Sequence, residues 1–348
     1  MGKNRQSNIE LLRIIAMFMI LVIHANMISL LRPTTDELLL NAIPTITRYF
    51  FESFGIVGVD IFVLISGWFL INTRAKSFFS FFFQILTLWG GIFLLMLFTG
   101  NTQLSVKNVL EVFAFTKWDW FVKAYIVLMI IAPILNTYVK NSSERLQRNI
   151  LIGFLVFQST YGWLGGANRF FVNGYGPLSF VGLYLLAQYI HSTIKQLETP
   201  HRIYRLFNLN KKCDLMVFIG SITINTFLNM TGLYLGIDIS NTIYAYTNPF
   251  TIIAALYLLL FFSKINIKNS RIVNMLAAGS FAVYLIHSQV DIRPLFNRAV
   301  LFIYASFNNV TCILVLFVFL VLVYIVSVAI DLPRLWMWNK LSKQFDIK

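Results

Sequence analysis

Long uncharged apolar runs constrain this sequence more than any other feature. The stretch from Thr311 to Ile330 has twenty residues without a charge, and the stretch from Ser77 to Phe98 has twenty-two. About 18 apolar residues are enough to cross the hydrocarbon core of a bilayer. Because lipid offers no partner to an unpaired backbone amide, unbroken runs of this length must be helical. The sequence therefore predicts an all-α, polytopic integral membrane protein.

The composition supports a protein that lies almost wholly in the membrane. Only 12% of the 348 residues are charged and 58% are hydrophobic, whereas a soluble domain has about 25% charged residues. The longest hydrophilic stretch, around residues 191–214, is too short to form a soluble domain of its own. We therefore expect one transmembrane domain over residues 1–348.

The apolar runs predict about ten transmembrane helices, whose limits are uncertain by a few residues. The predicted spans are residues 9–31, 46–71, 77–98, 120–139, 149–163, 177–193, 215–234, 245–263, 273–290 and 311–331.

The basic residues lie in the segments between these spans and favour one side of the membrane. When the segments are assigned to alternate sides, twenty of the 28 Lys and Arg residues fall on the side of the N-terminus. Cytoplasmic loops are the basic ones in membrane proteins, so both termini should be cytoplasmic. The net charge of +14 is thus explained by topology, and no nucleic-acid partner is predicted.

Three ionisable residues lie in the first predicted helix. Arg13 and His24 are eleven residues apart, which places them within about 20° of each other around a helix and roughly 16 Å apart along it. Arg13 should therefore lie at the inner interface and His24 deep in the membrane. Glu10 is close enough to pair with Arg13. Ionisable groups inside lipid are costly, so each is a functional candidate; a plain interfacial ion pair and a packed histidine are the structural alternative.

Two later spans each carry one more ionisable residue at a similar depth. Asp60 lies in the second span and His287 in the ninth, so that His24, Asp60 and His287 could share one layer. Asp291 follows His287 by four residues and could orient its ring on the same helical face. The three groups predict an acid–base site, and separate packing contacts are the other interpretation.

The remaining polar signals are weaker. The segment 117–120 (Lys-Trp-Asp-Trp) is more typical of an interfacial aromatic belt than of a sugar platform. His191 and His201 are predicted to be solvated in a basic cytoplasmic loop. The spacing of Cys213 and Cys312 suits neither a metal site nor a disulfide framework, so no metal is predicted. Four residues of a predicted outer loop could contact an acceptor: Tyr161, Trp163, Arg169 and Tyr175.

Several motifs, in order along the chain, resemble acyltransferase family 3. Arg13, ten residues and then His24 match the R-x10-H signature of that family. Other stretches resemble the family in the same order, although Ile14-Ile15 stands where many members have a glycine. These stretches are 10–17, 58–62, 65–71, Trp120-Phe121 with Tyr125 and Pro133, 183–189 and 284–287.

The resemblance, which runs from residue 9 to about 290, implies transfer of an acyl group from cytoplasmic acyl-CoA, commonly acetyl-CoA. The acceptor would be a hydroxyl of a cell-surface or exported polysaccharide, or of a lipid-linked sugar. The implied location is a bacterial inner (cytoplasmic) membrane, with membrane lipid around the chain. By the same resemblance, Arg13 and His24 have functional roles, and Asp60, Ser66 and His287 support them.

These residue types suit the implied chemistry. A sugar hydroxyl is a weak nucleophile and needs a positioned base, for which imidazole is well suited. Arg13, with Arg74 and Lys76 on the same side, suits the phosphates of CoA. Ser66 or His287 could stabilise the developing oxyanion. His24 could act as a general base or carry the acyl group itself, and the sequence does not separate the two.

Two other functions remain open from the sequence. In a proton-coupled carrier or flippase for an envelope lipid or oligosaccharide, His24, Asp60 and His287 would relay protons and Arg13 would be a gate. The apolar spans lack the matched pair of broken helices that is usual in such carriers. The third possibility is a structural partner of a polysaccharide synthesis complex.

Overall fold

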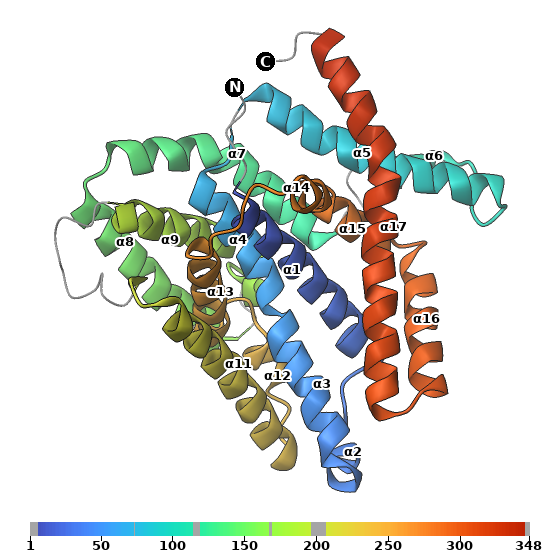
Figure 1. Cartoon of the computed structure of the whole chain (residues 1–348), viewed down its shortest axis with the longest axis horizontal. Coiled ribbons are helices and arrows are strands. Elements are labelled where there is room, and N and C mark those ends of the chain that lie inside the picture. Colours follow the sequence, from blue (N-terminus) through green and yellow to red (C-terminus); the bar gives the residue numbers. More distant parts are fainter. Residues whose placement is uncertain (1–5, 73, 114–118, 167–168, 196–206, 345–348) are drawn as a thin grey trace.

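The computed structural model describes residues 6–72, 74–113, 119–166, 169–195 and 207–344, and every regular element within them is a helix (Figure 1). The elements are α1 (Ser7–Ile23), η1 (His24–Ser29), α2 (Thr35–Leu40), α3 (Ala42–Gly55), α4 (Val57–Phe69), α5 (Ala75–Phe98), α6 (Val106–Phe113), α7 (Trp120–Asn141), α8 (Glu144–Phe157), η2 (Gln158–Leu164), η3 (Val172–Gly174), α9 (Pro177–Lys195), α11 (Lys211–Tyr234), α12 (Ser240–Ile243), α13 (Pro249–Ser263), α14 (Arg271–Ala278), α15 (Ser280–His287), α16 (Arg293–Ser306) and α17 (Asn309–Gln344). The predicted all-α class is confirmed.

Six helical segments of the described chain are long and apolar enough to cross a membrane. They are Ser7–Ser29, Ala42–Phe69, Ala75–Phe98, Trp120–Asn141, Lys211–Tyr234 and Val310–Gln344. The other predicted spans coincide with α8, α9, α13 and the α14–α15 pair, of which α13 and α14–α15 are shorter apolar helices. The total of about ten spans therefore stays a prediction.

Helix α1 lies inside the bundle (Figure 1). It packs against α3, α4, α13, α14, α15 and α17. Its residues Leu12, Ala16, Met19 and Leu21 are fully buried. Glu10 on α1 is buried, whereas the side chain of Arg13 is 29% exposed, so the ionisable side chains of α1 are covered by protein to different degrees.

A glycine allows α4 to approach α1 closely. A Cβ atom added at Gly58 would lie 2.6 Å from the backbone oxygen of Ala16 and 3.0 Å from Cβ of Met19. Small residues at such crossings let the backbones of membrane helices come together. This contact fixes α4 beside the middle of α1, between Arg13 and His24.

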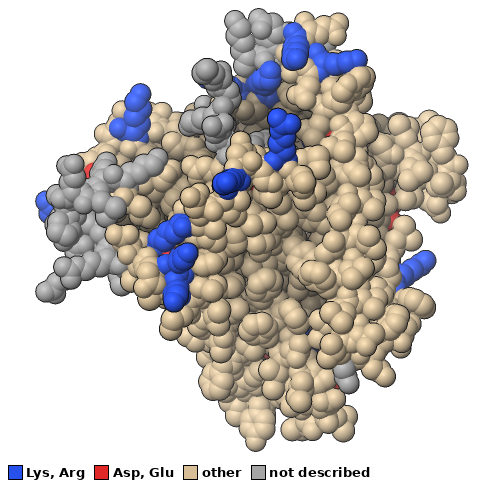
Figure 2. Space-filling model, in the orientation of Figure 1, with Lys and Arg blue, Asp and Glu red and all other residues tan. Residues whose placement is uncertain are grey.

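The charged residues are unevenly distributed over the molecule. The start of α1 and the end of α17 lie toward the upper end of Figure 1, and the Lys and Arg residues visible in Figure 2 gather over that half. The lower end of the same face is mostly uncharged. The cytoplasmic placement of the termini stays a prediction. Lys3, Arg5, Lys117, Arg202, Arg205 and Lys348, which contributed to it, lie outside the described residues.

Candidate active site

His24 stands where the first membrane helix changes its geometry. Residues Ser7–Ile23 are α-helical, and His24–Ser29 continue the same helix as a wider π-helix. The Ser29 hydroxyl oxygen lies 2.8 Å from both the His24 carbonyl oxygen and Oδ1 of Asn297. Single π-turns inside α-helices are frequent at functional sites. Here the wider turn is tied to the neighbouring helix α16.

The His24 and His287 rings are directly hydrogen-bonded. Nδ1 of His24 lies 2.7 Å from Nε2 of His287, and Nδ1 of His287 lies 2.6 Å from the carbonyl oxygen of Val283. A carbonyl oxygen can only accept, so Nδ1 of His287 carries a hydrogen and donates it. In neutral His287 the Nε2 atom then accepts from Nδ1–H of His24. This arrangement leaves Nε2 of a neutral His24 with a free lone pair, which is the form of a base.

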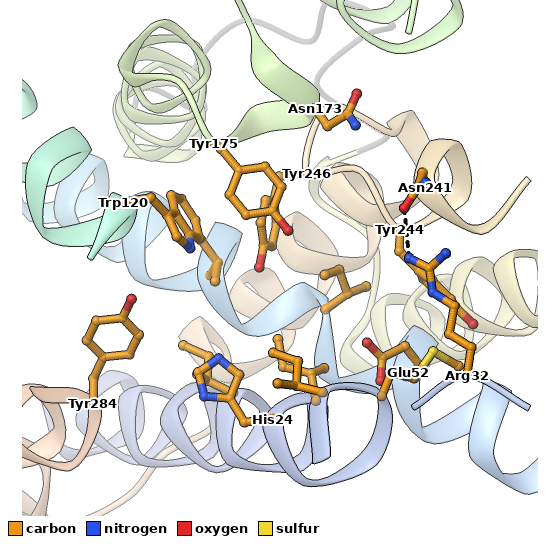
Figure 3. A pocket seen from close by; sticks show the side chains of 16 residues that line it. His24, Arg32, Glu52, Trp120, Asn173, Tyr175, Asn241, Tyr244, Tyr246 and Tyr284 are labelled. Carbon is orange, nitrogen blue, oxygen red and sulfur yellow. Dashed lines mark hydrogen bonds between the residues drawn. The ribbon is translucent and has the colours of Figure 1, made fainter. Parts of the chain in front are cut away.

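His24 lines a cavity of about 200 Å³ (Figure 3). The ring rises from its helix toward the aromatic side chains on the other side of the space. The remaining lining residues come from α1, η1 and the segment after η1, from α3, α4 and the residue between them, from the start of α7, from the connections before α9 and α13, and from α15. They are Ile20, Ile23, Met27, Ile28, Arg32, Glu52, Ile56, Val59, Trp120, Asn173, Tyr175, Asn241, Tyr244, Tyr246 and Tyr284.

Two connections shape the aromatic wall of the cavity. Gly174 has φ of +91°, and a Cβ atom there would lie 2.4 Å from Cβ of Tyr246. The Tyr246 amide donates to the carbonyl of Asn173 at 2.9 Å. Trp120 packs on Tyr175 with ring centroids 4.5 Å apart and on Tyr246 at 5.4 Å. The loop before α9 thus closes directly over the space next to His24.

A polar rim surrounds the exposed side of the cavity. The guanidinium of Arg32 donates to Oδ1 of Asn241 at 2.8 Å (Figure 3) and lies 3.4 Å from a carboxylate oxygen of Asp238. A hydrogen bond from the Ser240 amide, together with the Arg32 charge, lowers the pKa of Asp238 from its usual value. Asp238 is therefore ionised at neutral pH and offsets the Arg32 charge.

A buried glutamate also lines the cavity. Glu52 in α3 is 7% exposed, and one of its carboxylate oxygens accepts from Nδ2 of Asn26 at 3.0 Å. Arg48, one helical turn earlier, donates to Oδ1 of Asn26 and to the Leu31 carbonyl. Asn26 therefore lies between Arg48 and Glu52 and joins η1 to α3.

Comparison with known proteins decides the family. The family model described as an acyltransferase domain matches residues 6–332, nearly the whole chain. The chain belongs to acyltransferase family 3. No curated protein and no solved structure matches it. This acyltransferase is accordingly a multi-pass membrane protein, as its apolar helices also indicate.

In this acyltransferase no hydrogen bond joins Asp60 to the histidine pair. Asp60 is fully buried in α4, and neither carboxylate oxygen has a hydrogen-bond partner among the described residues. Ile56 and Val59 present one face of the chain to the cavity, and Asp60 is rotated by about 100° from Val59. The sequence predicted that His24, Asp60 and His287 share one layer. In the structure the two histidines are hydrogen-bonded to each other, and Asp60 is not hydrogen-bonded to either of them.

The predicted substrate-binding residues lie away from the cavity lining. Ser66 is hydrogen-bonded to Tyr125 at 3.0 Å and to the Phe62 carbonyl. Arg13 pairs with Glu10 at 3.1 Å, and its side chain is 29% exposed. Arg74 is exposed just before α5, at the same end of the molecule as the start of α1 (Figure 1). The cavity and these cations thus occupy different parts of the acyltransferase.

Two side predictions were wrong. Helix α15 ends at His287, so Asp291 is no longer on its face, and its carboxylate accepts from Gln289 at 2.8 Å. His191 belongs to α9 and not to a solvated loop, and its partly buried ring stacks on Trp68 with centroids 4.3 Å apart. His201 and the first two residues of the 117–120 motif lie outside the described residues.

Of the four outer-loop residues that the sequence analysis named as possible acceptor contacts, Tyr175 lines the cavity, and Tyr161, Trp163 and Arg169 are not among its lining residues. Sequence reasoning missed most of the other polar and aromatic lining. Glu52 lies inside the predicted span 46–71, so the rule that selected Asp60 should have selected it too. Trp120 was interpreted as part of an interfacial belt, whereas it forms a cavity wall. Tyr244 and Tyr246 gave no signal of their own, and Tyr284 was noted only within the stretch 284–287, because their meeting depends on how the segments before α13 and α15 pack around α1.

Proposed function

We propose that this acyltransferase is an O-acetyltransferase of a bacterial cytoplasmic membrane. It moves acetyl from acetyl-CoA to a hydroxyl of a cell-surface or exported polysaccharide, or of its lipid-linked precursor. The observation that carries the proposal is the His24–His287 hydrogen bond in the wall of the cavity. An imidazole oriented by a second group is the arrangement that nucleophilic acyl transfer requires.

The histidine pair provides both the base and its orienting group. His24 Nε2 takes the proton of the acceptor hydroxyl while the hydroxyl oxygen attacks the thioester carbonyl. The C–O bond forms, the C–S bond breaks, and the proton on His24 passes to the leaving CoA thiolate. Throughout, Nδ1–H of His24 donates to His287, and this hydrogen bond becomes stronger when His24 is positively charged.

His24 could instead receive the acetyl group itself before passing it to the acceptor. In that route His24 Nε2 attacks the thioester, and CoA leaves before the acceptor reacts. Single turnovers with labelled acetyl-CoA and no acceptor, stopped with denaturant at neutral pH, separate the two routes. Label bound to wild-type protein and absent from His24→Ala supports the acyl carrier, whereas no bound label supports the general base.

The donor side of the proposal rests on the cations at the other end of α1. Arginine has five N–H donors, and one hydrogen bond of Arg13 goes to Glu10. The others, with exposed Arg74 and Lys76 before and within α5, suit phosphate oxygens. These cations lie on the side predicted to be cytoplasmic, where acetyl-CoA is available.

The function is tested with purified protein in detergent and radiolabelled acetyl-CoA. His24→Ala should lower acetyl transfer about 100-fold or more, while His191→Gln, at a histidine outside the cavity, should keep wild-type transfer. Both variants should elute as wild-type protein does, since one imidazole does not decide the folding of a bundle of this size. Full transfer by His24→Ala would refute the proposed mechanism.

The acceptor is identified by chemical analysis of envelope polysaccharides from cells with and without this protein. Loss of O-acetyl groups from one sugar residue names the acceptor and the hydroxyl. Unchanged acetylation of every envelope polysaccharide contradicts a polysaccharide acceptor.

A further inference from the structure

We propose that the cavity beside His24 is the acceptor site and that Glu52 selects a neutral sugar ring with two neighbouring free hydroxyls. The inference rests on the proposed function, because it takes His24 as the group that meets the reacting hydroxyl. It adds a ligand class and a specificity-determining residue outside the histidine pair.

Glu52 presents a carboxylate to the cavity without a cationic partner among the described residues. One oxygen accepts from Asn26, and a carboxylate has about four acceptor positions. The nearby Arg48 guanidinium hydrogen-bonds instead to Asn26 and to the Leu31 carbonyl. Burying a carboxyl group with unfilled hydrogen-bonding positions is costly, so these positions call for a ligand with hydrogen-bonding groups of its own.

The neighbouring wall suits the flat face of a sugar. Trp120, Tyr175 and Tyr246 pack together with ring centroids 4.5 to 5.4 Å apart, and Tyr244 and Tyr284 complete the wall. Figure 3 shows Trp120, Tyr175 and Tyr246 on one side of the space, and His24 and Glu52 on the other. Pockets of this kind combine an apolar face with a few polar groups that fix orientation. A ring lying on the aromatic wall would direct its hydroxyls toward His24 and Glu52.

The size and charge of the cavity narrow the ligand. A space of about 200 Å³ suits one sugar ring and excludes several at once. Arg32 at the rim already forms an ion pair with Asp238, so no anionic ligand is needed to balance its charge. A carboxylate binds two neighbouring hydroxyls by accepting one hydrogen bond from each. We therefore assign the site to a neutral ring with a free vicinal diol next to the acetylated position.

The rim also indicates the direction of entry. Ile28, Arg32, Tyr175 and Asn241 are exposed residues of the lining, and they follow α1 or belong to the connections before α9 and α13. The basic residues that we propose to bind CoA (Arg13, Arg74 and Lys76) lie toward the opposite end of α1. Acceptor and donor therefore approach His24 from opposite sides, and the reacting hydroxyl need not cross the membrane.

The test uses soluble methyl glycosides as acceptors, with purified protein and acetyl-CoA. A glycoside with a vicinal diol is compared with its singly deoxygenated analogue. Wild-type protein should prefer the diol in kcat/KM by about 10- to 100-fold, the usual effect of a hydrogen bond to a charged group. Glu52→Gln should lose most of that preference by a rise in acceptor KM, while the KM for acetyl-CoA stays within about twofold.

Glu144→Gln serves as the matched control, because Glu144 begins α8 and is not part of the cavity lining; it should keep the wild-type preference. Glu52→Asp keeps the carboxylate and should retain part of it. If Glu52→Gln does not fold, the wild-type comparison of the two glycosides and the Glu52→Asp variant decide the question.

Three results overturn the inference and leave the proposed function standing. The first is an equal kcat/KM for the diol and deoxy glycosides, and the second is an unchanged acceptor preference in Glu52→Gln. The third is a Glu52-dependent preference for a glycoside of an amino sugar, together with inhibition by choline. The last result would assign the cavity to an ammonium group, which aromatic rings and a carboxylate also bind. Absence of any His24-dependent acetyl transfer, by contrast, overturns the proposed function itself.

Discussion

The two halves of the first membrane helix differ in geometry and in the partners of their ionisable side chains. The N-terminal half is a regular α-helix in which Arg13 pairs with Glu10, one turn away on the same helix. The C-terminal part is π-helical, and His24 bonds to His287 on a helix more than 260 residues later in the chain. One half satisfies its charge locally, and the other depends on the tertiary fold.

This difference separates two tasks along one helix. A cation with a local partner and spare N–H donors suits binding of a charged donor, and its loss should affect binding. An imidazole oriented by a distant residue suits proton transfer, and its loss should affect the rate. Substitutions in the two halves should therefore change different kinetic constants.

After the loss of His24 itself, replacing the orienting histidine should slow the reaction most. His287→Ala removes the acceptor of His24 Nδ1–H, so that the ring loses its fixed tautomer and orientation. We expect kcat to fall about 100-fold, with the KM for acetyl-CoA unchanged. Steady-state kinetics in detergent measure both. His287→Gln supplies an amide oxygen as a new acceptor and should restore part of kcat; equal loss in both variants would point to a packing role only.

Replacing the cation in the other half should affect donor binding. Arg13→Ala should raise the KM for acetyl-CoA about tenfold, the loss of one charge-assisted hydrogen bond, with little change in kcat. The matched control is Arg298→Ala, an exposed arginine in α16 beside the π-helical part. An unchanged KM in Arg13→Ala would remove Arg13 from the donor site.

A methyl group added at Gly58 of α4, which packs against α1 between Arg13 and His24, should destabilise the fold. The Cβ atom of Gly58→Ala would lie 2.6 Å from the Ala16 backbone oxygen, which costs about 1–3 kcal/mol when helices must shift. We expect a lower Tm in detergent by scanning fluorimetry. Gly220→Ala in α11, where an added Cβ meets nothing within 4 Å, should leave the Tm unchanged or raised. Equal Tm values for both variants contradict the close α1–α4 contact.

The smallest effect is expected at Asp60. Because a catalytic base must lie within hydrogen-bond reach of its proton and Asp60 has no hydrogen bond to either histidine, Asp60→Asn should change kcat by no more than about twofold. The same transfer assay measures it. A loss as large as that of His287→Ala would return Asp60 to the catalytic group and break the two-part division.

Helical periodicity was enough to place part of this site from the sequence. The rotation between Arg13 and His24 and the depths of His24 and His287 follow from residue number alone. The His24–His287 hydrogen bond agrees with a shared depth for the two rings, and α1 and α15 are helical up to the residues concerned. Asp291 was misplaced because α15 ends at His287. Beyond the end of a helix, a spacing of four residues no longer places two side chains on one face.

The rest of the site depends on contacts that no spacing rule describes. The π-helix from His24 to Ser29 is held by Asn297 and by the Asn26–Glu52 hydrogen bond. Tyr246 reaches the cavity because Gly174 lets a loop pack against it. A single sequence shows that such residues are polar or aromatic, and only the packed fold shows which of them meet.

A double-mutant cycle on the two histidines tests the central claim most directly. When two residues act as one unit, replacing the second after the first causes no further loss of rate. The double variant His24→Ala/His287→Ala should therefore transfer acetyl no more slowly than His24→Ala alone. If the two losses instead multiply in the double variant, the histidines act independently, and the hydrogen-bonded pair is not the catalytic base.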